Sequence, residues 1–166
     1  SSSLLRSAFA AVAVALALTG TPGASAADDL DAAAARLDAL DRRITRLEDA
    51  NQVEILQRTY GYFVDKGQWT QLSQLFADDA TLEIGGRGVF LGRARVLEYM
   101  QTAFGKDGAK EGSLANHMQF QSIPDISADG KTGWIRSRAY VMGIGGWGLP
   151  LYKNDYKKED GVWKMS

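Results

Sequence analysis

The sequence contains no cysteine, only one histidine and only three prolines among its 166 residues. Without cysteine the chain has no disulfide framework, no thiol nucleophile and no thiolate zinc site. A single histidine leaves only scattered carboxylates as further ligands, so we expect no metal. We also expect no phosphate-binding loop, because neither glycine-rich segment, 85–88 or 145–148, has the helix start or the lysine that such a loop uses.

An excess of charge of one sign is also missing. The chain has 19 lysines and arginines against 20 aspartates and glutamates, a formal net charge of −1. Nucleic-acid partners are recognised by clustered basic residues, and the sequence has no such cluster. We therefore expect a protein that binds no nucleic acid.

The first 26 residues have the order of a secretory signal peptide. Arg6 supplies a positive charge, residues 8–18 form an apolar run, and residues 24–26 (ASA) offer the small side chains of a cleavage site. The run is shorter than the about 20 apolar residues that a stable membrane anchor needs. The sequence predicts an exported protein, periplasmic or extracellular, with no stable membrane anchor after cleavage. A buried apolar helix is the alternative.

Residues 27–50 predict a helical arm. Two rows of residues repeat every seven positions, the second row three residues after the first: Leu30, Leu37, Ile44 and Asn51, then Ala33, Leu40 and Leu47. This is the a/d pattern of about three heptads. Two interpretations stay open. The arm is either a short coiled coil that pairs two chains, or a solvated spacer that packs on its own domain.

Residues 51–166 predict one α+β domain, because helical patterns come first and strand patterns follow. The helical patterns are 52–66, which Gly67 caps, 69–76 and 93–104. The strand patterns are a hairpin around 85–87 and long strands at 117–126, 132–144, 151–159 and from 162 onward. Asp129-Gly130 and Asp160-Gly161 fit tight turns. We expect a cone-shaped, curved antiparallel sheet packed on the long helix and two shorter helices, with the last strand cut short at Ser166.

Several stretches of this domain match a known family. They are residues 60–72 (YGYFVDKGQWTQL), 75–80 (LFADDA), 116–117 (NH), 129–130 (DG) and 156–164 (YKKEDGVWK). Together they resemble the SnoaL-like family of the nuclear transport factor 2-like superfamily, which includes scytalone dehydratases and polyketide cyclases. The resemblance covers about residues 51–166. It implies a cone fold that moves protons, without a cofactor, on a small, mostly apolar substrate with a carbonyl group.

The resemblance implies that Asp65 and His117 are catalytic. Asp65 lies in the last helical turn, where the helix dipole disfavours a carboxylate by about 0.3–1 kcal/mol. A residue placed against local preference is a functional candidate, and histidine exchanges protons near neutral pH. In the hypothesis, Asp65 takes a proton and His117 donates one to a leaving hydroxyl or holds the carbonyl oxygen. The structural alternatives are an exposed helix-end aspartate and a histidine that only supports its strand.

Tyr60 and Tyr140 are the candidate substrate-binding residues, because a tyrosine can hydrogen-bond a carbonyl from an apolar wall. Tyr60 shares the helix of Asp65, and Tyr140 lies on the strand where the family's dehydratases carry a second histidine. Gly61 lies one turn before Asp65. It either leaves room for a ligand or lets a strand pack closely, and we favour the strand.

Two functions stay open. The first is an exported, cofactor-independent dehydratase, isomerase or cyclase with an apolar pocket. The alternative is a non-catalytic module of the same fold that binds a small apolar molecule or pairs two chains. Arg136 and Arg138 share a strand face with Trp134 and Tyr140. This face either binds an anionic group or is a polar sheet face in a homodimer interface, and we favour the interface.

Overall fold

The computed structural model describes residues 25–109, 111–112, 115–143 and 145–166. The predicted signal peptide lies outside these residues, apart from its last two. The chain divides into two units, residues 1–43 and 44–166. Within the described ranges no helix is long and apolar enough to cross a membrane.

The first helix, α2, runs from Ala26 to Asp65 and contains both the predicted arm and the first helix of the predicted domain. In the first unit, no residue from Ser25 to Arg43 is buried. The helix ends as predicted, with Gly67 at a positive φ of 62°. The N–H of Gly67 donates to the carbonyl of Val64 at 3.1 Å and that of Gln68 to Phe63 at 2.9 Å, the pair of bonds that closes a Schellman cap.

The second unit is α+β, as predicted, and its main sheet is antiparallel. The strands are β3 (Asn116–Ile126), β4 (Thr132–Gly143), β5 (Gly146–Gly148), β6 (Leu151–Glu159) and β7 (Val162–Met165). Their order is β3-β4-β6-β7, and β5 pairs with the end of β4. The two Asp-Gly turns are confirmed, since Gly130 and Gly161 have φ of 68° and 81°. Strand β5 was not predicted: residues 146–148 pair with 141–143 instead of only crossing between strands.

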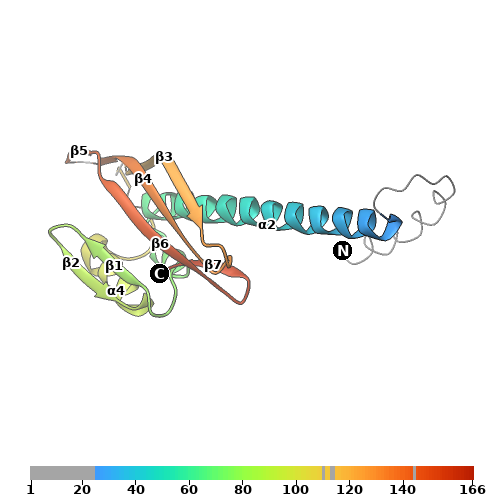
Figure 1. The fold of residues 1–166 in the computed structure, drawn as a ribbon. Helices are drawn as coiled ribbons and strands as arrows, with labels where there is room; N and C mark the ends of the chain where they lie inside the picture. The colour runs from blue at the N-terminus through green and yellow to red at the C-terminus, as the bar shows by residue number, and fades with distance from the viewer. Residues whose placement is uncertain (1–24, 110, 113–114, 144) are drawn as a thin grey trace. The chain divides into compact units, whose positions relative to one another are not determined.

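The sheet curves across the second half of α2 (Figure 1). The core between them contains Val53 from the helix and Ile126, Ile135 and Tyr156 from three strands. Gly133 in β4 permits a close approach, because a Cβ there would lie 2.8 Å from the carbonyl oxygen of Asp125. The predicted architecture of a curved antiparallel sheet on a long helix is confirmed.

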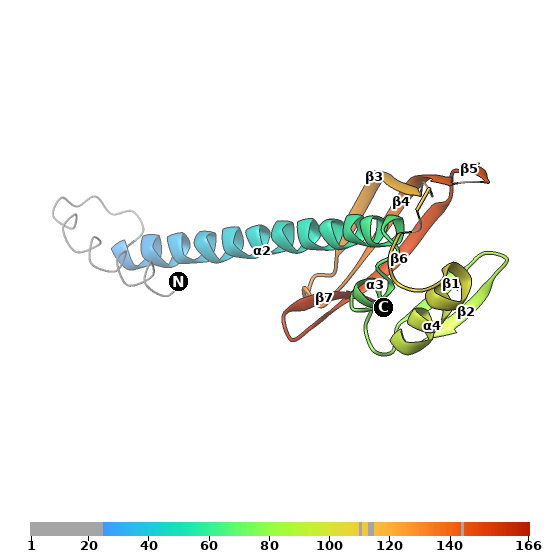
Figure 2. The same ribbon diagram turned by 180° about the vertical axis from the view of Figure 1, so that it is seen from behind.

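Two short helices and a hairpin complete the second unit: α3 (Trp69–Ser73), α4 (Arg93–Phe104), β1 (Thr81–Ile84) and β2 (Gly88–Leu91). Both views show α4 beside the hairpin (Figure 2), and the ring of Tyr99 stacks on Phe90 at 4.0 Å. Helix α3 is shorter than the predicted 69–76. The chain leaves it because Leu75 and Ala77 exchange backbone hydrogen bonds with Met165 of β7, at 2.9 and 2.8 Å.

Candidate functional site

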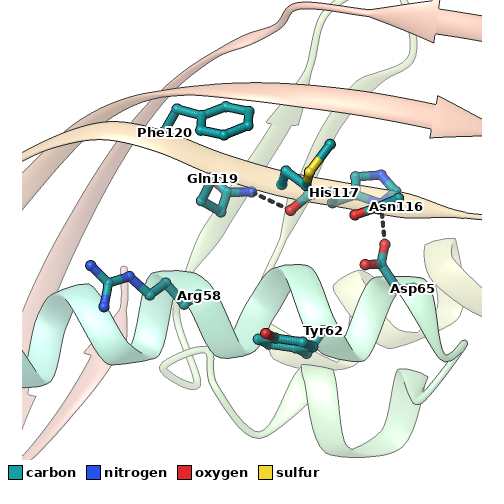
Figure 3. Close-up of a pocket in the computed structure, with 8 residues that line it drawn as sticks. Arg58, Tyr62, Asp65, Asn116, His117, Gln119 and Phe120 are labelled. Atoms are coloured by element: carbon teal, nitrogen blue, oxygen red, sulfur yellow. Dashed lines mark hydrogen bonds and ion pairs between the residues drawn. The ribbon is translucent and has the colours of Figure 1, made fainter.

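Asp65 and His117 meet where the last turn of α2 reaches the start of β3 (Figure 3). Oδ1 of Asp65 lies 2.7 Å from Nδ1 of His117, and the two side chains are only 16% and 19% exposed. A carboxylate accepts hydrogen bonds, so Nδ1 carries a proton, and in the neutral ring Nε2 keeps an acceptor lone pair. Among the described residues Nε2 has no hydrogen-bond partner. The arrangement is that of a base oriented by a carboxylate.

Gly61 allows this meeting. A Cβ at position 61 would lie 2.8 Å from the backbone oxygen of His117, a distance that real Cβ contacts do not reach. Strand β3 therefore approaches α2 more closely at this point than a side chain would permit. The predicted strand packing at Gly61 is confirmed, and it sets His117 beside Asp65.

A pocket of about 290 Å³ opens beside the pair, close to the lower end of the range for small-molecule sites. It is lined by one face of α2 and five consecutive residues of β3: Arg58, Tyr62, Asp65, Asn116, His117, Met118, Gln119 and Phe120 (Figure 3). Tyr62 is 71% exposed and Phe120 is 45% exposed, so the pocket is open to solvent. Its walls mix aromatic, amide and charged groups, and it is less apolar than predicted.

The structure does not bring Tyr60 to the pair. Tyr60 is only 7% exposed and packs edge-on against Phe76 and Tyr152, with ring centroids 6.3 and 6.2 Å away. Burial, followed by the nearby Tyr152 and Tyr99, raises the pKa of its hydroxyl. Tyr60 precedes Asp65 by five positions, which corresponds to roughly 140° around a helix. Tyr60 therefore faces the core and does not line the pocket.

Tyr140 lies on the other face of the sheet. His117 pairs with Val141, whereas Tyr140 pairs with Met118. Because alternate residues point to opposite faces, Tyr140 and His117 project from different sides. The ring of Tyr140 stacks on Trp147 at 6.0 Å, and Tyr140 is not among the pocket residues.

Sequence reasoning missed Arg58 as a pocket residue, and it considered Tyr62 for substrate binding but preferred Tyr60 and Tyr140. Arg58 and Tyr62 precede Asp65 by seven and three positions, which places all three side chains on one helical face. If the face of the helix that carries Asp65 had been placed toward the pocket, both residues would have been identified from the sequence. The contribution of residues 118–120 had no such signal, because it depends on β3 being the edge strand of the sheet.

The pocket residue Gln119 belongs to a hydrogen-bonded cluster of polar side chains that reaches the buried Gln57. Oε1 of the fully buried Gln57 accepts from the Tyr156 hydroxyl and the Asn154 amide, each at 2.5 Å. The amide of Gln57 donates to Oε1 of Gln119 at 3.1 Å. Burial raises the pKa of the nearby Tyr152 hydroxyl. A hydrogen bond from Gln119 lowers this pKa in part, and the negative charge of Asp65 raises it. Gln119 therefore connects the pocket wall to the interior.

In the described part of the chain, no three histidine, aspartate or glutamate side chains gather in a group that could hold a metal ion.

Several solved structures share this fold. An NTF2-like protein with a cystatin-like fold from Novosphingobium aromaticivorans is 21% identical, with 78% of this chain and 84% of that chain covered at a TM-score of 0.64. The hexachlorocyclohexane dehydrochlorinase LinA-type3 from Novosphingobium barchaimii LL02 is also 21% identical, with coverage of 75% and 86% and a TM-score of 0.62. These likenesses show the fold alone.

Two comparisons of the sequence itself gave different results. A search of curated protein sequences found no match. The SnoaL-like domain, by contrast, matches residues 45–166, which is most of the chain. The match contains the part of α2 that carries Asp65, the strand that carries His117 and the main sheet. The chain therefore belongs to the SnoaL-like domain family, and it shares its fold with an NTF2-like protein.

Proposed function

We propose that this protein is an exported, cofactor-independent enzyme of the lyase or isomerase type that moves a proton on a small ring compound. The observation that carries the proposal is the 2.7 Å contact between Asp65 Oδ1 and His117 Nδ1 at the wall of the pocket. A base, an orienting carboxylate and a space for a substrate are the parts that such chemistry requires.

The proposal assigns the two roles differently from the expectation based on the sequence. His117 is the base, because Nδ1 is bound to Asp65 and Nε2 accepts the substrate proton. Asp65 holds the ring and stabilises the imidazolium that forms. As the C–H bond breaks, its electron pair either forms a double bond while a leaving group departs with its own pair, or moves onto a neighbouring carbonyl oxygen. Asn116 and Arg58 offer N–H donors at the wall for that oxygen or leaving group.

A relative supports the first form of the reaction. Hexachlorocyclohexane dehydrochlorinase has the same fold, and its name describes removal of hydrogen and chloride, which is proton abstraction coupled to loss of a leaving group. The proposed substrates are therefore small cyclic compounds with an acidic C–H beside either a carbonyl or a leaving group. Export rests on the N-terminal pattern of residues 1–26 and is tested by fractionating cells that make the chain with and without this segment.

The reaction is tested by proton exchange. The protein is incubated in D2O with a panel of cyclic ketones, β-hydroxyketones and chlorinated cyclohexanes, and deuterium uptake or product formation is followed by NMR. We expect turnover of at least one class and a loss of about 10²–10⁴-fold in His117→Ala. Asp65→Asn should lose activity as well, since an amide that donates to Nδ1 forces the proton onto Nε2.

Tyr140→Phe is the matched control, because Tyr140 lies on the opposite sheet face from His117, and it should keep wild-type turnover. Circular dichroism establishes that each variant is folded. Unchanged turnover in His117→Ala, or no exchange with any class of the panel, would contradict the proposal.

One observation favours a second function. Gln119 of the pocket wall is hydrogen-bonded to the buried Gln57, and the pocket is open at Tyr62. A shallow, open site suits a module that binds a small apolar molecule without changing it. Compounds of the panel that raise the melting temperature of the protein but show neither exchange nor product would favour this function.

A further inference from the structure

The first half of α2 carries an unpaired row of large aliphatic side chains. Leu30, Leu37, Leu40, Ile44 and Leu47 each leave between 50% and 70% of their surface exposed. They occupy the a and d positions of three consecutive heptads, and Ala33 occupies the remaining d position. One continuous helix therefore presents a narrow apolar seam, and a seam of this period fits another helix of the same period.

The charges beside the seam are ordered. With Leu30 at a, the g positions hold Arg36 and Arg43, and the e positions that follow hold Asp41 and Glu48. In a parallel pair of helices each g residue faces the e residue of the next heptad on the partner. Arg36 would then meet Asp41 of a second copy, and Arg43 would meet Glu48. Two copies in register form four such attractive pairs.

An antiparallel arrangement would bring g to g and e to e. Arginines would then face arginines, and Asp41 and Glu48 would face other carboxylates, which is unfavourable. Asn51 at the last a position adds a second restraint, since a single buried asparagine at a favours two strands in register. The charges and Asn51 thus select the same arrangement.

The seam has a defined end. The next d and a positions are Glu54 and Arg58, which form an ion pair with each other at 2.7 Å on the same helix. From Asp49 onward α2 is held by buried contacts of the second unit, at Asp49, Val53 and Gln57. Because this end of the helix is already formed, the seam does not have to nucleate a short isolated helix. Three heptads are therefore enough for pairing.

We propose that residues 30–51 pair with the same residues of a second copy of this chain as a parallel, in-register, two-stranded coiled coil. The occupant of the exposed seam is the protein itself. The assembly is independent of the Asp65–His117 pair.

Single cysteines test the register in the full chain, which has no cysteine of its own. Leu37→Cys, at an a position, should form a disulfide-linked dimer under mild oxidation, because equivalent a residues face each other in a parallel pair. Arg42→Cys, at the outer f position, is the matched control and should stay uncrosslinked. Equal crosslinking of the two variants, or none in Leu37→Cys, would overturn the arrangement.

Reversing the charges tests whether the g and e residues select the parallel, in-register pair. The variants Arg36→Glu/Arg43→Glu and Asp41→Lys/Glu48→Lys should each self-associate roughly tenfold or more weakly than wild type by light scattering. Mixing them in equal amounts should restore the dimer, because every g–e pair is attractive again. Dimers that persist in both variants, a mass other than that of two chains in the wild type, or a mixture that stays monomeric would overturn the proposal.

Discussion

The two halves of α2 use the same backbone in opposite ways. From Ala26 to Arg43 no residue is buried, although this half carries regular aliphatic residues. From Ile44 to Asp65 five residues are buried, and only Val53 and Tyr60 among them are large and apolar. Asp49, Gln57 and Gly61 complete the buried face. The apolar repeat thus lies on an exposed side of the helix, while the buried face combines Val53 and Tyr60 with polar groups and a glycine.

The largest expected effect on stability is at Asp49. Its Oδ1 accepts from Lys158 Nζ at 2.5 Å and from the Trp163 indole N–H at 2.9 Å, while the residue is 4% exposed. Asp49→Ala leaves both donors without a partner in a mostly buried place. We expect a loss of about 3–5 kcal/mol in the free energy of unfolding, measured by urea denaturation.

Asp125→Ala provides the comparison, because it breaks the ion pair that joins Arg46 of α2 to the sheet at 3.0 Å. Both partners of that pair are about half exposed, so the loss should be about 0–1 kcal/mol. Equal losses in Asp49→Ala and Asp125→Ala would show that the polar face of the second half does not hold the helix.

The next largest effect on the free energy of unfolding is expected when glycine and alanine are exchanged in each half of α2. In an exposed helix, alanine is more stable than glycine by about 0.5–1 kcal/mol. Gly61→Ala should instead destabilise the protein by about 1–3 kcal/mol, because the new methyl meets the His117 carbonyl at 2.8 Å. Activity should fall with it as β3 moves. Ala35→Gly in the exposed half should cost only the helix-propensity difference, and a stabilised Gly61→Ala would refute the close approach.

The smallest effect is a fall in stability at alkaline pH that depends on a buried tyrosine. It concerns only the buried half of α2, since residues 26–43 contain no tyrosine. Burial raises the pKa of Tyr60 above its ordinary value. Its contribution to stability is therefore complete below about pH 10 and is lost as the pH rises further, because the unfolded chain ionises first. Between pH 10 and 11, wild type should lose about 1 kcal/mol more than Tyr60→Phe in chemical denaturation. Parallel curves would contradict the burial of this hydroxyl.

Much of the fold was predictable because its signals are local. The glycine cap at Gly67, the Asp-Gly turns and the hairpin around residues 85–87 all depend on backbone conformations that few residues adopt. Strand β5 escaped prediction because three residues rich in glycine carry no strand pattern, and only their pairing with β4 orders them. The end of α3 escaped for a similar reason, since it depends on backbone bonds to Met165, about 90 residues away.

The site was predictable only in part. Asp65 and His117 were chosen from local preference and family resemblance, and the structure places them in contact. Tyr60 and Tyr140 were chosen because they lie on the right elements, yet neither faces the pocket. The angle of Tyr60 around α2 and the register of Tyr140 against β3 decide this, and a shift of one residue in register turns a strand side chain to the other face.

The sequence by itself determined the helical period of α2, the heptads with their ordered charges, and the turns, because each depends on residues close together in the chain. The tertiary structure alone decided which side of α2 is buried, how closely Gly61 approaches β3, and that one acid and one imidazole share a pocket. Those features depend on contacts between residues more than 50 positions apart, which no local preference specifies.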